Sequence, residues 1–421
     1  MSSQPSTDSS PGVVDRVRVA VLGSTGSIGR QTVDVLERLS NRFEVRCLAA
    51  GGNAALLAEQ AARLRPREVA LAHSGGIPEL RAALPAGVNI AVDAGSADAL
   101  EALATRADVD MVVVGTAGVV SLGPVLAALR AGKVVATANK ETLVMAGHLV
   151  MGEARARAVE VAARDPRSPL AEPLGWVRPI DSEHSAIWQC LAGERMRSVA
   201  RLVLTASGGP FLDATTDQLA AVSPEQALRH PTWRMGAKIT VDSATLANKG
   251  LEVVEAHWLY DLAYDAIDVV IHPQSVVHSA VQFVDGSLKA QLGTPDMRLP
   301  IQYALTYPER HPSPVAAPDL VATARLDFRA PDETRFPALR IARDAGRIGS
   351  RATAALISAD EVAVGRFLAG TLDFPGIPHV LEAAVTRFGE GADQAPDLAS
   401  LVELDGEVRD AFAAPAAGAG R

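Results

Sequence analysis

The sequence predicts an α/β protein in three parts: a doubly wound parallel sheet, a central α+β region and a small C-terminal bundle of helices. Two observations lead to this fold class. Up to about residue 150, short runs rich in β-branched residues alternate with amphipathic stretches, which is the pattern of parallel strands joined by crossover helices. After about residue 332, only helical patterns follow one another.

The first part is predicted over residues 17–163, after a Ser- and Pro-rich tail of residues 1–16 that we expect to be disordered. The runs that predict its strands are residues 17–22, 45–49, 69–72, 88–92, 111–114 and 134–137. The segments with apolar side chains at helical spacing are residues 28–39, 54–64 and 124–129. Strands and helices that alternate in this way form a sheet with helices on both faces.

The second and third parts begin after a polar, Pro-containing boundary at residues 164–173. The central region, residues 174–306, mixes strands with helices and holds nearly all the unusual polar clusters. Residues 307–331 are rich in Pro and Ala and predict an extended linker. The terminal domain, residues 332–413, is predicted to be a small bundle of helices at residues 336–345, 353–368, 377–388 and 397–412.

Composition and charge exclude several classes of protein. A net charge of −9 and an aromatic content of 4% argue against a nucleic-acid surface, which needs basic stripes and stacking platforms. No apolar run reaches the ~18 residues that span a bilayer. The two cysteines, Cys47 and Cys190, lack a CxxC partner, so we expect them to be reduced core residues. Together these features predict a cytoplasmic protein without a membrane or nucleic-acid partner.

A glycine-rich loop follows the first predicted strand and opens the first predicted helix. It reads Gly-Ser-Thr-Gly-Ser-Ile-Gly at residues 23–29. Glycines allow the backbone to approach a pyrophosphate, and the free N–H groups at a helix start favour negative charge. The spacing alone also fits a tight turn without a ligand. Because the loop lies within the first βαβ unit, it predicts a dinucleotide site in a Rossmann-like domain.

Two further segments lie at the carboxyl edge of the predicted sheet, where such folds bind ligands. After the second strand the sequence is Ala-Gly-Gly-Asn at residues 50–53, without the carboxylate that would bind the ribose of NAD. An acidic side chain there would repel a 2′-phosphate, so its absence permits NADP, although no nearby Arg or Lys is evident to hold that phosphate. After the last strand comes Asn139-Lys140-Glu141, which is either functional or a helix start with solvated charges.

Asp181 and Glu183 predict a metal site. They follow an extended run at residues 177–180, and residues two apart in an extended chain point the same way. The two carboxylates would then converge as hard oxygen ligands for Mg²⁺ or Mn²⁺, and His184 would face away. A solvated acidic pair is the alternative interpretation.

A second polar cluster, residues 242–252, favours the metal interpretation. Ser243, Asn248 and Lys249 predict a phosphate cradle, with Lys249 as a point charge. Glu252 would supply the third metal oxygen. Glu255 lies one helical turn further on and either supports the metal site or is a solvated acid.

Two loops complete the predicted pocket. Ser207 precedes two glycines after a strand at residues 199–205, and a hydroxyl followed by Gly N–H groups can form an anion-binding nest, or be a plain turn. Residues 230–236, His-Pro-Thr-Trp-Arg-Met-Gly, combine polar, aromatic and sulfur side chains. That composition suits a lid over a ligand, and it also suits ordinary packing.

Taken in this order, the motifs resemble those of the 1-deoxy-D-xylulose-5-phosphate reductoisomerase family, from about residue 17 to about residue 412. The most specific parts are residues 181–184, 230–236 and 248–252, behind the glycine loop. The sequence Ile-Ser-Ala-Asp-Glu at residues 357–361 departs from the Asn-Ala-Ala-Asn-Glu expected there. The resemblance implies a homodimer, the cofactors NADPH and Mg²⁺ or Mn²⁺, and a sugar-phosphate substrate.

The resemblance also implies roles for individual residues. Those that it puts at NADPH are Thr25, Gly26, Ser27, Ile28, Gly51, Gly52, Asn53, Asn139, Glu141 and Gly236. The metal ligands that it implies are Asp181, Glu183 and Glu252. Those that it puts at the sugar phosphate are Lys140, Ser182, Glu183, Ser207, His230, Ser243, Asn248, Lys249 and Glu252. The catalytic residues that it implies are Lys140, Glu183, His230 and Glu252.

The implied reaction converts 1-deoxy-D-xylulose 5-phosphate to 2-C-methyl-D-erythritol 4-phosphate by a rearrangement, with the metal as Lewis acid, and a reduction by NADPH. Other functions explain the sequence less well. A thioester-forming dehydrogenase needs a catalytic cysteine, and only Cys190, inside an apolar run, is available. A homoserine-type dehydrogenase would not explain three carboxylates beside a phosphate cradle. A silent NADP-binding regulator would be expected to have lost one of the carboxylates or the lysine.

Overall fold

A seven-stranded sheet with the strand order β4-β3-β2-β1-β5-β6-β7 forms the first part of the computed structural model, which describes residues 16–91, 96–391 and 395–413. Its strands are β1 (Val17–Leu22), β2 (Phe43–Ala50), β3 (Glu68–Leu71), β4 (Asn89–Ile90), β5 (Met111–Val114), β6 (Val134–Thr137) and β7 (Val177–Pro179). Every neighbouring pair is parallel. The chain moves outward from β1 first to one edge and then to the other, so the order reverses between β1 and β5, where ligands bind in such sheets.

The helices of this part are α1 (Ser27–Arg38), α2 (Ala54–Leu64), α3 (Ile77–Ala83), α4 (Ala97–Thr105), α5 (Leu122–Arg130) and α6 (Lys140–Ala162). They cover both faces of the sheet, so Val19, Val21 and Val112 on its central strands are fully buried. The predicted doubly wound parallel sheet is therefore confirmed. The predicted tail, apart from residue 16, and the end of the strand expected at 88–92 lie outside the described residues.

The first sheet extends beyond the predicted boundary at residues 164–173. After α6 come a short helix, α7 (Pro173–Trp176), and then β7, which pairs with β6 through Val135 and Val177. We expected these residues to belong to the central region. Pro179 does not prevent the pairing, because β7 is the edge strand and needs to donate hydrogen bonds on one side only. The consequence for the site is that Asp181 leaves directly from the edge of the first sheet.

A second, four-stranded sheet has the order β11-β10-β8-β9. Its strands are β8 (Val199–Ala206), β9 (Ile267–Ile271), β10 (Val277–Phe283) and β11 (Leu288–Leu292). Its helices are α8 (Ser182–Leu191), α9 (Thr216–Ala220), α10 (Pro224–Ala227), α11 (Ala237–Thr245), α12 (Ala247–Tyr260) and α13 (Arg298–Thr306). Only β8 and β9 run parallel, so the sheet is mixed, as expected for an α+β region.

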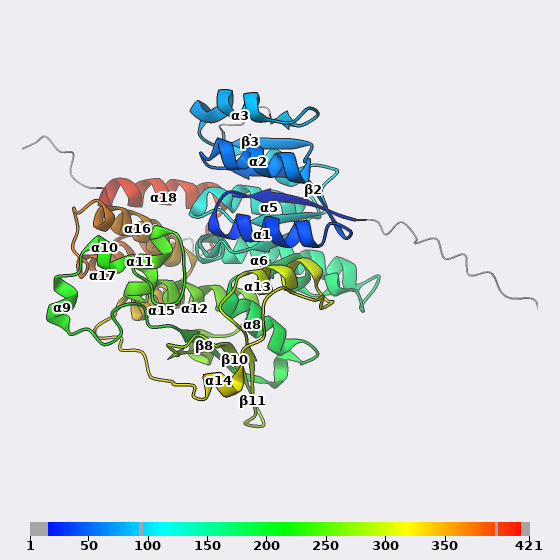
Figure 1. The fold of residues 1–421 in the computed structure, drawn as a ribbon. Helices are drawn as coiled ribbons and strands as arrows, with labels where there is room; N and C mark the ends of the chain where they lie inside the picture. Colours follow the sequence, from blue (N-terminus) through cyan, green and yellow to red (C-terminus); the bar gives the residue numbers. More distant parts are fainter. Residues whose placement is uncertain (1–15, 92–95, 392–394, 414–421) are drawn as a thin grey trace, which may run out of the picture.

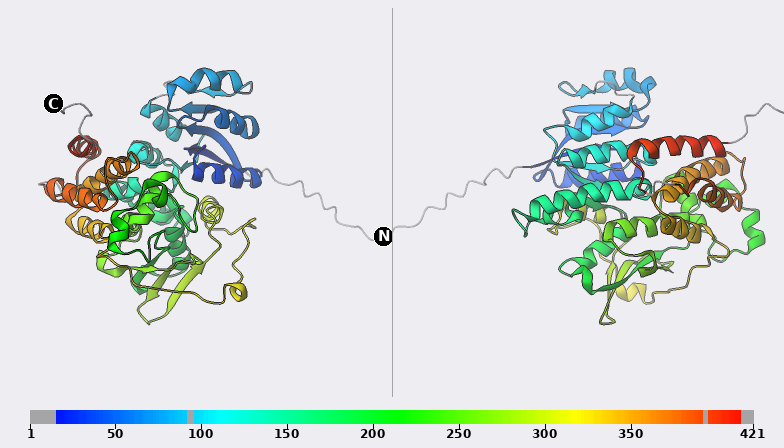
Figure 2. Two further views of the ribbon diagram at one scale, coloured as in Figure 1. Left: turned by 60° about the vertical axis from the view of Figure 1, so that its left-hand side comes forward. Right: turned by 180° about the vertical axis from the view of Figure 1, so that it is seen from behind.

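The terminal helices are α15 (Ala338–Ile348), α16 (Ser350–Leu368), α17 (Gly376–Phe388) and α18 (Leu398–Phe412). They confirm the predicted bundle, and they pack through α15 on α12 and through α16 on α6. The expected linker, residues 307–331, contains one short helix, α14 (Leu320–Thr323). The first sheet lies at one end of the molecule, the second sheet at the other, and the bundle along one side (Figures 1 and 2).

Within the part of the chain that the structure describes, no helix is long and apolar enough to cross a membrane.

Candidate active site

A large cavity of about 1210 Å³ lies between the first sheet and the helices α11 and α12. It is lined by the glycine loop after β1, the segment after β2, the start of α6 and the polar cluster of α11 and α12. Of the residues that the family resemblance puts at cofactor, metal or substrate, all except Asn139 line this one cavity. The chain therefore brings together motifs that are up to two hundred or so residues apart in the sequence.

The glycine loop has the geometry of a backbone cradle. Gly23 has a φ of +86°, a conformation that side chains strongly disfavour. A Cβ at Gly29 would overlap the carbonyl oxygen of Gly23, so the first turn of α1 packs directly on the loop. Gly26 is the N-cap residue of α1 and provides no side-chain cap, which leaves the first N–H groups of the helix for a ligand. The loop fits a pyrophosphate for this reason.

The segments after β2 and β6 carry the remaining cofactor predictions. Asn53 caps α2, because its Oδ1 accepts the N–H of Leu56 at 3.0 Å. Asn139 is buried away from the cavity, where its Nδ2 donates to the carbonyl oxygens of Thr116 (3.0 Å) and Gly118 (2.7 Å) and its Oδ1 caps α6. Its hydrogen-bonding groups hold the loop after β5, so a direct contact with NADPH is not what this geometry provides.

Three carboxylates converge at the other end of the cavity. One oxygen each of Asp181, Glu183 and Glu252 lies within 4.8 Å of the others. The prediction that they meet is confirmed, but the predicted local geometry is wrong. Asp181 is the N-cap of α8 and Glu183 lies in the first helical turn, so a turn of helix, and not an extended chain, brings them together. Glu252 reaches them from α12.

Two lysines lie among these carboxylates. The Nζ of Lys140 is 2.7 Å from Asp181 Oδ2 and 3.3 Å from Glu252 Oε1. The Nζ of Lys249 is 2.9 Å from Glu183 Oε1 and also forms an ion pair with Glu252. Sequence reasoning placed Lys249 in a phosphate cradle apart from the metal ligands, and the structure places it between two of them. The reason is helical spacing, since Lys249 and Glu252 are one turn apart on α12.

The electrostatics of this end follow from burying so many charges together. Burial, followed by the charge of Glu252, raises the pKa of Glu183. Burial opposes ionisation of Asp181 as well, but Lys140 beside it holds its pKa well below the usual range. Burial disfavours the charged form of Lys140, yet Asp181 and Glu252 raise its pKa well above the usual value. Three acids and two ammonium groups thus leave an excess of negative charge, which suits a divalent cation.

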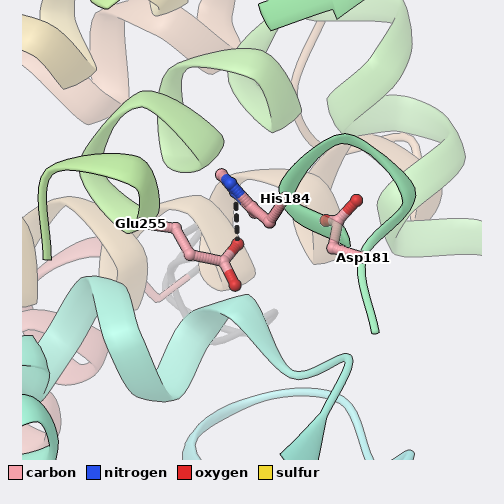
Figure 3. A group of neighbouring side chains, drawn as sticks. All are labelled: Asp181, His184 and Glu255. Carbon is pink, nitrogen blue, oxygen red and sulfur yellow. Dashed lines mark ion pairs between the residues drawn. The ribbon is translucent and has the colours of Figure 1, made fainter. Parts of the chain in front are cut away.

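His184 forms a second group with Asp181, against the prediction that it faces away. Asp181, His184 and Glu255 each offer a ligand atom, and these atoms lie within 4.8 Å of one another (Figure 3). The Nε2 of His184 is 3.0 Å from Glu255 Oε2, and both side chains are almost fully buried. Burial would lower the pKa of His184, but the charge of Glu255 raises it. Glu255 is therefore a buried partner of His184, not a solvated acid.

His230 connects the two loops of the predicted anion site. Its Nδ1 accepts the backbone N–H groups of Thr232 (3.1 Å) and Trp233 (2.9 Å). Burial lowers the pKa of His230, which favours the neutral ring, and because Nδ1 accepts these N–H groups, the proton of that neutral ring is on Nε2. That nitrogen is 3.0 Å from Ser207 Oγ and 3.1 Å from Ser243 Oγ. These donors and hydroxyls, beside the positive-φ glycines 208 and 209, suit a phosphate group.

Lys238 is a cavity residue that sequence reasoning missed. Its Nζ is 2.7 Å from Asp242 Oδ2 and 2.5 Å from Asp360 Oδ2, and it joins α11 to α16 of the terminal bundle. Burial, followed by the charge of Asp360, raises the pKa of Asp242 to about 8. The spacing of four residues between Lys238 and Asp242 is the signal that could have indicated this pair. Asp360 belongs to the segment that departs from the family pattern.

Comparisons with known proteins agree along the chain. Residues 19–147 match the family model described as 1-deoxy-D-xylulose 5-phosphate reductoisomerase, and residues 177–260 and 292–411 match models of the C-terminal domains of this enzyme. The protein of this name from Heliobacterium modesticaldum is 49% identical, over 96% of this chain and 98% of its own length. That from Pelotomaculum thermopropionicum is 48% identical, over 93% and 96%.

Solved structures agree as well. The reductoisomerase from Zymomonas mobilis, solved with NADPH, superposes with a TM-score of 0.83 at 37% identity, over 94% of this chain and 98% of that one. A DOX-P reductoisomerase solved with NADPH, fosmidomycin and magnesium has the same TM-score and identity, over 94% and 97%. The chain therefore belongs to the 1-deoxy-D-xylulose 5-phosphate reductoisomerase family.

Proposed function

We propose that the cavity described above is where this chain performs the reaction of its family. That reaction is the NADPH-dependent rearrangement and reduction of 1-deoxy-D-xylulose 5-phosphate to 2-C-methyl-D-erythritol 4-phosphate, with a divalent metal ion. The observation that carries the proposal is that Asp181, Glu183 and Glu252 converge within 4.8 Å in the same cavity as the glycine loop. Hydride donor, Lewis acid and substrate must all meet for this chemistry, and one cavity of about 1210 Å³ holds room for the three.

The cofactor end would bind NADPH mainly through backbone groups. The N–H groups at the start of α1 would take the pyrophosphate. The segment after β2, with Gly51, Gly52 and Asn53, would lie at the adenosine ribose. Glu141 and Gly236 also line the cavity, and we assign them to the nicotinamide half of the cofactor.

The metal end would hold Mg²⁺ or Mn²⁺ through Asp181, Glu183 and Glu252. When bound, such a cation supplies Lewis-acid polarisation of neighbouring substrate oxygens. Glu183 and Glu252 both form ion pairs with Lys249. If the same two carboxylates held a metal cation, the ammonium group of Lys249 would lose these partners. A released Lys249 could turn to the substrate phosphate, which reconciles its contacts with the predicted role. Lys140 would remain beside Asp181 and Asn248, where its ammonium group can orient substrate oxygens.

The phosphate of the substrate would be held by Ser207, Ser243, Asn248 and the Nε2–H of His230. Contacts to a group remote from the reacting carbons contribute binding energy that orients those carbons. Trp233 and Met235 also line the cavity, and closure of their loop over the substrate stays a prediction.

The test is NADPH oxidation in the presence of 1-deoxy-D-xylulose 5-phosphate, with and without a chelator. We expect metal-dependent oxidation and a branched, phosphorylated product identified by mass spectrometry. Absence of oxidation with the metal restored would contradict the proposal and revive a silent dinucleotide-binding protein.

We also propose a cytoplasmic homodimer. Family membership supports the dimer, and the two buried, free cysteines, Cys47 and Cys190, are typical of a reducing compartment. Light scattering of the purified protein would give the mass in solution. A mass near one chain, 43.9 kDa, at micromolar concentration would contradict the dimer.

A further inference from the structure

The 2′-phosphate of NADPH distinguishes it from NADH, and the sequence shows no Arg or Lys beside the position where that phosphate belongs. In a sheet of this kind the adenosine ribose lies at the end of the second strand. Here that strand ends at Ala50, and Gly51 and Gly52 follow it without any functional side chain. The charge that recognises the phosphate must therefore come from another segment.

The neighbouring loop supplies a basic side chain at this position. β3 pairs with β2, and the register continues past both strands, because Ala72 N donates to Ala50 O and His73 N donates to Gly51 O, each at 2.9 Å. His73 is thus fixed directly beside Gly51 and Gly52. A Cβ built on Gly52 would lie 2.5 Å from Nδ1 of His73, so the imidazole occupies the space that a side chain at residue 52 would need.

The imidazole of His73 is available for a ligand. It is exposed, and within the described ranges of the chain it has no hydrogen-bond or ion-pair partner. His73 is not itself a lining residue of the cavity, but it lies directly beside Gly52 and Ala72, which both line it. Gly51, the other neighbour, has nothing within 4 Å of where its Cβ would be, which leaves open space for a ligand group.

We propose that His73 binds the 2′-phosphate of NADPH, and that residue 52 is glycine here because a side chain would displace the imidazole. This inference rests on the proposed function, since it assigns a residue to a cofactor of that reaction. An imidazole donates an N–H to a phosphate oxygen and adds a positive charge when protonated. The rival cation is Arg30, which lines the cavity from α1, close to where the pyrophosphate would lie.

The experiment measures dissociation constants of NADPH and NADH by fluorescence titration of the full chain. His73→Ala should weaken NADPH binding about tenfold, the loss of one charge-assisted contact at an exposed position, and change NADH binding less than about twofold. His73→Arg should keep the preference for NADPH. The matched control is His379→Ala, the same change at an exposed histidine on α17, remote from the cavity, which should alter neither constant.

A double-mutant cycle tests the role of Gly52. Gly52→Ala should weaken NADPH binding by about the same factor as His73→Ala, because it pushes the ring aside. In the His73→Ala background the same substitution should have almost no further effect. Adenosine 2′,5′-bisphosphate should compete less well against the His73→Ala variant, whereas 5′-AMP should compete equally against both proteins.

Three outcomes would overturn the inference. They are equal losses for NADPH and NADH in His73→Ala, additive effects of the two substitutions, and a loss of NADPH preference in Arg30→Gln but not in His73→Ala. Failure of the proposed function would look different, because the unmodified chain would then show no NADPH oxidation with the sugar phosphate. A chain that turns over NADPH while His73→Ala keeps its preference leaves the function standing and removes only His73.

Discussion

The cofactor end and the metal end of the cavity differ in the chemical groups that line them. The cofactor end consists mainly of backbone: glycines 23, 26 and 29, the first N–H groups of α1, and Gly51 and Gly52 after β2. The metal end consists of charged side chains from α6, from the start of α8 and from α12; those of Lys140, Lys249 and Glu252 are buried, and those of Asp181 and Glu183 are partly buried.

This difference decides what each end can tolerate. A backbone site depends on space, so an added methyl group is damaging there. A buried charged site depends on neutralisation, because each unpaired ion there costs several kcal/mol, whereas its volume can change slightly. The predictions below separate the two kinds of dependence.

The largest effect is expected from Glu252→Gln. Glu252 is a proposed metal ligand and also the shared partner of Lys140 and Lys249. Loss of several kcal/mol of Lewis-acid stabilisation should lower kcat/KM by roughly 10²-fold or more, with the NADPH dissociation constant within about twofold of the original. Glu403→Gln on the exposed face of α18 is the control. Normal turnover at ordinary metal concentrations would remove Glu252 from the ligand set.

Gly29→Ala should weaken NADPH binding and leave the metal dependence of the activity unchanged. Its Cβ would overlap the carbonyl oxygen of Gly23, so the loop must move, and we expect NADPH affinity to fall about tenfold or more and unfolding free energy to fall by about 1–3 kcal/mol. The metal concentration for half-maximal activity should stay constant. Gly152→Ala, in α6 with nothing within 4 Å of its Cβ, should be neutral or stabilising. An unchanged NADPH affinity in Gly29→Ala would contradict the tight cradle.

Lys249→Ala and Asp181→Asn should separate substrate binding from metal binding within the metal end. Loss of the Lys249 contact should raise KM for the sugar phosphate about ten- to a hundredfold, since charge-assisted contacts contribute roughly 1.5–3 kcal/mol. The apparent metal constant should stay the same or fall, because Glu183 and Glu252 lose a competing cation. Asp181→Asn should mainly raise the metal constant. The opposite pattern, with Lys249→Ala affecting metal alone, would assign Lys249 to the metal site.

The smallest effect concerns Lys238, which is shared by two buried carboxylates. The pKa of Asp242 is about 8 in the folded chain and near 3.8 when unfolded, so the folded state binds more protons between these values. Stability should therefore fall as pH rises from about 4 to about 8. Asp360→Asn removes the like charge and should reduce this fall by roughly 1–2 kcal/mol. Thermal melts at about pH 5.5 and about pH 8.5 measure it, and an unchanged difference in Tm would contradict the shared-lysine account.

The contrast between the two ends also explains how far the sequence alone could be interpreted. The glycine loop, the segment after β2 and the parallel sheet are local patterns, and each was predicted because backbone geometry depends on neighbouring residues. The three converging carboxylates were proposed from their residue types and positions, but the extended geometry argued for Asp181 and Glu183 was wrong, since α8 begins at Ser182.

By itself the sequence indicated most strands of the first sheet, the helices of the terminal bundle, the glycine loop that opens α1 and the polar cluster at 242–252. Only the tertiary structure decided that His184 pairs with Glu255, that Lys249 lies between Glu183 and Glu252, and that His73 stands beside Gly52. The physical reason is the separation along the chain over which each kind of interaction acts. Backbone conformation is set within a few residues, whereas the partner of a buried charge is whichever opposite group the packing of distant elements brings within hydrogen-bonding distance.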